Sequence, residues 1–202
     1  RVNFETLLYQ VLRSSGEQTS ADTNLTSAFS VGTGVRVVNA DKLFSQGSIV
    51  STDNALDLAV DGAGFFQVLL PDGRIGYTRN GTFSRNNEGA LTTSSGFVIQ
   101  PEVVIPEDAQ EINVSSDGVV SVQLPGAVEQ EEVGQIELAE FQNRNGLQPI
   151  GESFYVETTA SGEAIIANPL EGSFGKLVQG ALESSNVSVV KELVDMIETQ
   201  RA

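Results

Sequence analysis

Turn-forming residue pairs divide the middle of this chain into short apolar stretches, and this feature limits its fold most strongly. Asn and Asp tolerate the left-handed backbone conformation of primed hairpin turns, and Gly adopts it without steric cost. Such pairs occur at Asp72-Gly73, Asn80-Gly81, Ser95-Gly96, Asp117-Gly118, Asn145-Gly146 and Ser161-Gly162. The pattern predicts a mainly β fold, in which residues 31–180 form an antiparallel β-domain of many short strands and hairpins.

One stretch before the first turn predicts which side chains face the core. Leu58 and Val60 alternate with Asp57 and Ala59, so we expect the first two to point inward and the others outward. Gly62 and Gly64 follow this run. Glycines inside a strand pattern indicate a bulge or the close approach of another backbone segment.

The N-terminal end has helical spacing. Apolar residues recur there at intervals of three and four, at Phe4, Leu7, Leu8, Val11 and Leu12. The spacing predicts a helix, although so short a stretch also fits an extended strand. Residues 14–30 are small and polar, which is typical of a loop or an extended arm. We therefore expect residues 1–30 to form a helical or extended segment followed by a linking arm.

The C-terminal end has the same spacing. Its apolar stripe consists of Val190, Leu193, Val194 and Ile197, and Ser188 before it is a candidate N-cap. A terminal helix this short is only marginally stable in isolation. Residues 181–202 are therefore predicted to begin a helix that packs against residues 4–12 or against another chain.

Composition removes many functional classes. The chain has no Cys and no His, which excludes Cys/His zinc sites and catalysis by Ser-His-Asp or Cys-His groups. Its net charge of −16 disfavours nucleic acids and anionic membrane surfaces. No stretch approaches the roughly 18 apolar residues of a membrane span. We therefore predict no cofactor, no metal site, no nucleic-acid partner and no membrane insertion, and enzymes that depend on Cys or His are excluded.

Three blocks of sequence, in order, resemble one family. Residues 57–101 contain GAGFFQV followed by YTRNGTF, and residues 180–202 read GALESSNVSVVKELVDMIETQRA. Both resemble segments shared by the bacterial flagellar rod and hook proteins. The stretch from residue 7 to residue 37, with LLYQ, a polar arm and GTGVRV, is most similar to the distal rod member. The usual N-terminal helix of the family is absent before Arg1, so we expect a core that lacks most of the paired terminal helices.

The resemblance implies a structural subunit of the distal rod, the rigid drive shaft that carries torque from motor to hook. It implies export through the flagellar secretion channel to the periplasmic basal body. The implied partners are further copies in a helical polymer, other rod proteins, the hook protein and the surrounding rings.

The resemblance also implies roles for particular residues. The expected assembly surface comprises Phe4, Leu7, Leu8 and Leu12 with Val190, Leu193, Val194 and Ile197. The expected stiffening arm includes Tyr9, Gln10, Gln18, Thr19 and Leu25.

Two alternatives are open at this point. The first is a hook or proximal rod subunit of the same family. The second is a carbohydrate-active enzyme or adhesin built on a β-domain. It is disfavoured because sugar-binding clefts use stacking aromatic residues, whereas this chain has no Trp and only 3 Tyr.

Overall fold

The computed structural model describes residues 2–6, 9–13, 18–20, 23–24, 29–32, 35–40, 42–126 and 129–201, with only the backbone described before residue 42. The chain divides into two compact units, Arg1–Leu43 and Phe44–Ala202. Each is considered by itself.

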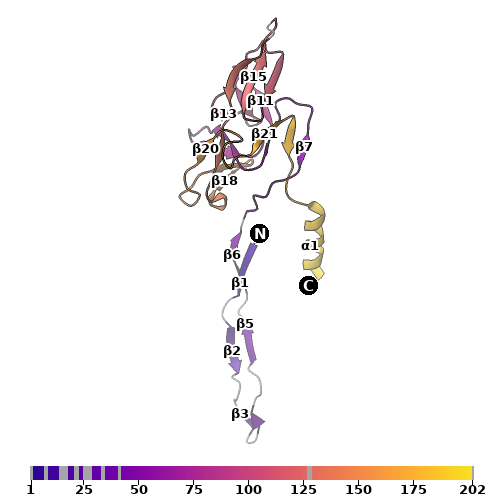
Figure 1. Ribbon diagram of the computed structural model, residues 1–202. Coiled ribbons are helices and arrows are strands. Elements are labelled where there is room, and N and C mark those ends of the chain that lie inside the picture. Colours follow the sequence, from indigo (N-terminus) through magenta and orange to yellow (C-terminus); the bar gives the residue numbers. More distant parts are fainter. Residues whose placement is uncertain are drawn as a thin grey trace. The chain divides into compact units, whose positions relative to one another are not determined.

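Nested antiparallel strand pairs make up the first unit. The pairs are β1 (Val2–Thr6) with β6 (Val35–Ala40), β2 (Tyr9–Arg13) with β5 (Phe29–Gly32), and β3 (Gln18–Ser20) with β4 (Thr23–Asn24) (Figure 1). The described part of the unit is therefore a two-stranded β-ribbon.

The helix predicted over residues 4–12 is wrong, and the extended alternative is the one observed. Val2, Phe4 and Thr6 alternate with polar residues, and β6 opposite them is rich in β-branched valine. Alternation of this kind suits a strand, and paired backbone groups satisfy hydrogen bonds that a short helix would leave open at its ends. Leu7, Leu8 and Leu25 lie outside the described residues.

A nine-stranded antiparallel sheet is the largest part of the second unit. Its main path runs β11 (Phe83–Arg85), β12 (Leu91–Thr93), β13 (Val98–Gln100), β9 (Phe65–Leu69), β10 (Ile75–Thr78), β19 (Phe154–Val156) and β18 (Gln148–Gly151). β9 also pairs with β17 (Leu138–Glu140), which pairs with β20 (Ile165–Ala167). This arrangement confirms the predicted mainly β, antiparallel fold.

Smaller sheets and two helical segments complete the unit. One sheet has three strands, β14 (Glu111–Val114), β15 (Val119–Gln123) and β16 (Glu131–Gln135). Two further sheets have two strands each. They are β8 (Leu58–Asp61) with β21 (Lys176–Gln179), and β7 (Ile49–Ser51) with β22 (Ala181–Glu183). A 3₁₀ turn, η1, spans Arg144–Gly146, and α1 spans Val189–Arg201.

Three of the six predicted turn pairs close hairpins, but their geometry differs from the primed turns expected. In the Asp72-Gly73 hairpin, Leu70 N–H donates to Arg74 O and Gly73 N–H donates to Leu70 O. These bonds close a three-residue loop in which Gly73 has φ +80°. The same pattern recurs at Gly96 and Gly118, and also at Gly89, which was not predicted.

The other three predicted pairs are not hairpin turns. Ser161-Gly162 lies between β19 and β20, which do not pair with each other. Gly146 ends η1. Gly81 is a point of close approach, because a Cβ there would lie 1.6 Å from Leu58 O. Since no side chain fits in that space, Gly81 is required for packing and not for turn geometry.

Strand β9 is buried on both faces, and it joins the two apolar clusters. Phe66 packs edge-to-face on Phe83 at 5.1 Å between ring centroids, in the larger cluster. Phe65 packs against Phe141 at 6.1 Å in the smaller one. The core therefore lies on both sides of the sheet.

Burial on both faces also explains one wrong prediction. Asp57 and Ala59 were expected to face outward, yet both are buried alongside Leu58 and Val60. The Asp57 carboxylate accepts hydrogen bonds from the Thr52 hydroxyl at 2.8 Å and the Asn54 amide at 2.9 Å. These donors compensate its loss of water.

We predict that Phe66→Ala lowers the free energy of unfolding by about 3–5 kcal/mol, because a fully buried aromatic side chain is replaced by a cavity. Leu69→Ala, on the same strand but 40% exposed, is the matched control and should cost less than about 1 kcal/mol. Urea unfolding followed by circular dichroism measures both values. Equal losses would contradict the assignment of the core.

Candidate assembly interface and the clamp at its base

The C-terminal helix presents its apolar stripe to solvent. Val190, Leu193, Val194 and Ile197 are 73%, 51%, 47% and 53% exposed, and Met196 beside them is 54% exposed. No residue of α1 is buried. The predicted helix and its stripe are therefore confirmed. Glu192 N–H donates to Ser188 O, so Ser188 has the N-cap position expected of it.

Two connecting segments of the second unit lie beside each other. Residues 44–48 lead into β7, and residues 184–188 lead from β22 to α1. β7 pairs with β22 in antiparallel register, and Ser184 N–H donates to Ser48 O at 2.8 Å. The Asn186 amide donates to Ser45 O at 2.9 Å and to the Ser45 hydroxyl at 3.1 Å. The two connections thus form one paired element.

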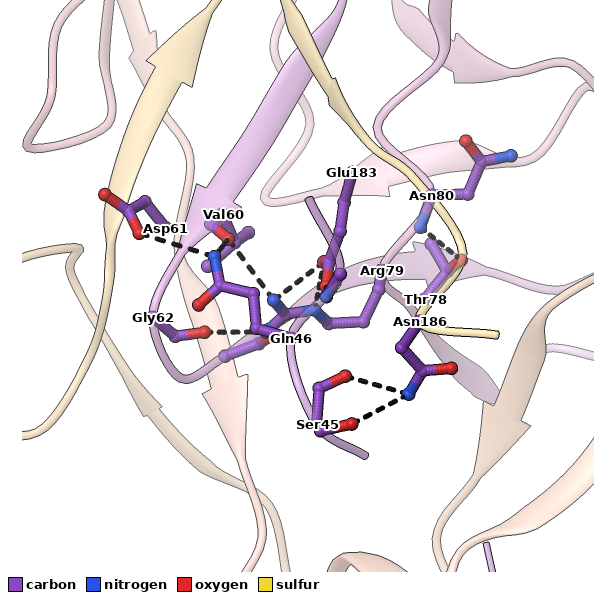
Figure 2. Close-up of polar contacts among 12 residues, drawn as sticks. Ser45, Gln46, Val60, Asp61, Gly62, Thr78, Arg79, Asn80, Glu183 and Asn186 are labelled. Atoms are coloured by element: carbon purple, nitrogen blue, oxygen red, sulfur yellow. Dashed lines mark hydrogen bonds and ion pairs between the residues drawn. The ribbon is translucent and has the colours of Figure 1, made fainter. Parts of the chain in front are cut away.

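Arg79 fastens this element to the β-domain (Figure 2). Its Nε and Nη2 lie 2.8 and 2.7 Å from Glu183 Oε2, at the end of β22. Nη1 donates to Gly62 O at 2.8 Å and to Gly64 O at 2.9 Å, and Nη2 donates to Val60 O at 3.2 Å. One planar guanidinium therefore holds a carboxylate and three carbonyl oxygens, a geometry that lysine cannot reproduce.

Glu183 extends the connection to the N-terminal side. Its second oxygen, Oε1, accepts a hydrogen bond from Gly47 N–H at 2.8 Å. A Cβ at Gly47 would lie 1.8 Å from Ser184 O, so only glycine allows the two connections to approach this closely. Arg79, Glu183 and Gly47, together with the Asn186–Ser45 contact, are called the clamp below.

The clamp is largely shielded from water. The side chains of Arg79 and Glu183 are 23% and 12% exposed, and the guanidinium carbon lies 6.0 Å from the centroid of the Phe65 ring. Shielding strengthens charge-assisted hydrogen bonds, since water competes less for the donors and acceptors. The arrangement fixes chain segments in place and offers no reactive group.

The glycines that precede β9 give the clamp its shape. Gly62 and Gly64 have φ values of +122° and +136°. A Cβ on Gly62 would lie 2.8 Å from Gly175 Cα, and one on Gly64 would lie 3.0 Å from the Leu138 side chain. The close backbone approach predicted for these glycines is confirmed at Gly62, whereas Gly64 lies against a side chain. Both carbonyls accept hydrogen bonds from Arg79.

The sequence reasoning did not identify the clamp. Arg79 lies within YTRNGTF, which was quoted for its resemblance but given no role. An arginine near two strand glycines, in a strongly acidic chain, was the signal that could have indicated it. Glu183 is 104 positions away along the chain and carries no local signal.

The N-terminal residues predicted for the assembly surface and the arm are only partly described. Phe4, Leu12, Tyr9 and Gln10 lie in the paired strands β1 and β2, and Gln18 and Thr19 lie in β3.

The described residues contain no group of three or more Asp and Glu side chains placed to hold a metal ion. A hollow of about 410 Å³ is lined by Asp72, Glu152, Phe97 and Phe154, among others. The side-chain hydrogen bond from Arg74 lowers the pKa of Asp72. No helix among the described residues is long and apolar enough to span a membrane.

We predict that Arg79→Met lowers the free energy of unfolding by about 2–3 kcal/mol, since it removes charge-assisted hydrogen bonds and leaves Glu183 without its cation. Arg74→Met is the matched control, because Arg74 forms an exposed ion pair with Asp72 and should leave stability unchanged. Urea unfolding measures both variants. An Arg79 variant as stable as the Arg74 variant would contradict the clamp.

Comparison with known proteins places Arg79 and Glu183 of the clamp in family segments. A family model described as the flagellar hook protein FlgE/F/G D1 domain matches residues 59–122, which include Arg79. A second, described as the flagellar basal body rod FlgEFG protein C-terminal, matches residues 178–202, which include Glu183.

Individual relatives match most or all of the chain. The flagellar basal-body rod protein FlgG of Buchnera aphidicola from Schizaphis graminum is 47% identical over all of this chain and 78% of its own length. FlgG of Bacillus subtilis is 36% identical over all of the chain and 77% of its own. FlgF of Caulobacter vibrioides is 33% identical over 79% of the chain and 61% of its own. The resemblance stated above, including the choice of the distal rod member, is confirmed: the chain belongs to the family of bacterial flagellar hook and basal-body rod proteins.

Proposed function

We propose that this chain is a structural subunit of the flagellar distal rod and that copies of it polymerise through the exposed apolar face of α1. The main support for this proposal is the exposure of that face. Its four large apolar side chains have no partner within α1 itself and lie in water. Burying them stabilises an assembled form by roughly 25 cal/mol for each Å² of apolar surface removed from water.

The clamp suits a shaft that transmits torque. A load applied at α1 passes along residues 184–188 to β22, and Arg79 joins β22 to the carbonyls that precede β9. β9 pairs with three other strands and is buried on both faces. The connection therefore ends in the most rigid part of the unit instead of in a surface loop.

In this proposal the same assembly surface also includes Phe4, Leu7, Leu8 and Leu12. The stiffening arm includes Tyr9, Gln10, Gln18, Thr19 and Leu25. The chain works without turnover and is not an enzyme. Its other partners are the remaining rod proteins, the hook protein and the surrounding basal-body rings. It is exported through the flagellar secretion channel and works in the periplasmic part of the basal body.

The helix face is tested in a version of the chain extended with the terminal helices of the family. We expect straight tubes in negative-stain electron microscopy. We also expect Leu193→Asp to abolish them, because a carboxylate cannot be buried in an apolar contact without a large desolvation cost. Thr199→Asp, off the stripe on the same helix, is the matched control and should still polymerise. Tubes from both variants would refute a role for this face, and curved tubes from the parent would favour a hook subunit.

The arm is tested by deletion. Removing residues 14–26 should leave the second unit folded, since none of its described strands pairs with that segment. The extended chain with this deletion should form bent or fragile tubes, as judged by electron microscopy and by resistance to dilution. Straight, stable tubes from the deletion would show that the arm does not stiffen the rod.

A further inference from the structure

The edge strand β20 is apolar and unprotected. Ile165 and Ile166 are adjacent on it and are 57% and 50% exposed. Successive strand residues point to opposite faces, so β20 is open to solvent on both. β17 occupies one of its edges, and no described strand pairs with the other.

A third apolar side chain extends this surface. Leu170 follows three residues after β20 and is 57% exposed. Its φ is +67°, a conformation that residues with a side chain rarely adopt. The loop is nevertheless ordered, because Leu170 N–H donates to Gly175 O and Glu171 N–H donates to Asn168 O. The fold thus holds a large apolar side chain in water beside an open edge.

β7 is the second edge of this kind. Ile49 and Val50 are 36% and 53% exposed, and β22 occupies one edge of the strand. No described strand pairs with its outer edge. β7 and β20 lie on opposite sides of the β-domain in the view of Figure 1.

Other edges of the unit carry the features that prevent association. β18 contains Pro149 and an irregular register beside it. β16 contains Glu131 and Glu132, and β11 contains Arg85. Charged residues, proline and bulges are the usual protection of an exposed edge, and β7 and β20 have none of the three.

Charge limits where two copies can meet. Residues 1–43 contain as many basic as acidic side chains, so the net charge of −16 lies entirely on residues 44–202. Most surfaces of this unit therefore repel another copy. β7 and β20 are uncharged, apolar and of equal length, so a second copy can approach at these strands without bringing carboxylates of the two strands together.

We propose that β20 of one copy pairs edge to edge with β7 of the next, so that each β-domain adds strands to its neighbour. The contact joins two different patches and leaves one of each free, which lets it repeat along an open polymer. This inference rests on the proposed function, since it supplies a lateral contact between outer domains of a polymer that α1 holds together.

Cysteine cross-linking tests the contact directly, because the chain has no Cys of its own. Val50→Cys and Ile166→Cys place thiols at the centres of the two strands, where they face each other whichever way the strands run. A short bismaleimide is added to assembled tubes of the extended chain. The double variant should give a ladder of dimers, trimers and larger products on a denaturing gel. A mixture of the two single variants should give dimers, and each single variant alone should give monomers.

Glu131→Cys with Ile150→Cys is the matched control on two protected edges and should give no ladder. Tubes without a ladder from the Val50 and Ile166 pair would overturn the contact while leaving the rod function intact. Dimers from Ile166→Cys alone would also overturn it, because they require two like edges to meet. If the extended chain forms no tubes, the rod proposal fails. Cross-linking of the 202-residue double variant in concentrated solution then tests the contact. A ladder would support the contact, and the absence of a ladder would overturn it.

Discussion

The guanidinium of Arg79 is the group on which the rest of this structure depends. It binds Glu183 from the C-terminal connection and the carbonyls of Val60, Gly62 and Gly64 from the approach to the central strand. Through Glu183 it also holds the amide of Gly47 in the N-terminal connection. Five donors in a rigid plane allow one side chain to satisfy all these acceptors. Without it, the two connections would be tied together by β7 and β22 but less firmly to the core.

The core explains why the clamp can bear a load. β9 contributes Phe65 to one apolar cluster and Phe66 to the other, so a displacement of this strand disturbs packing on both faces of the sheet. Close-packed interiors resist such displacement, because small shifts lose many contacts at once. The clamp therefore joins the connections to the part of the unit that deforms least. A distal rod subunit has to carry torque without bending, and this arrangement meets that requirement.

Local chemistry made much of the fold predictable. Gly73, Gly96 and Gly118 close hairpins where the sequence placed them, and α1 begins after Ser188 as its cap predicted. Predictions failed where distant segments decide the outcome. Residues 4–12 have helical spacing, but pairing with β6 and β5 makes them extended. Asp57 looked exposed because nothing local reveals the second layer that buries it. The clamp was missed for the same reason, since Arg79 and Glu183 meet only in the folded chain.

Amide hydrogen exchange at Gly47 tests the central claim most directly. Its N–H reaches the carboxylate of Glu183, and that carboxylate is held by Arg79. If the clamp and the core form one unit, this amide should exchange only when the whole unit unfolds, with the same opening free energy as Leu58 N–H in the core. In Arg79→Met the protection at Gly47 should fall while that at Phe66 in β9 persists. Rapid exchange at Gly47 in the parent, at the rate of an amide without a hydrogen bond, would contradict the account.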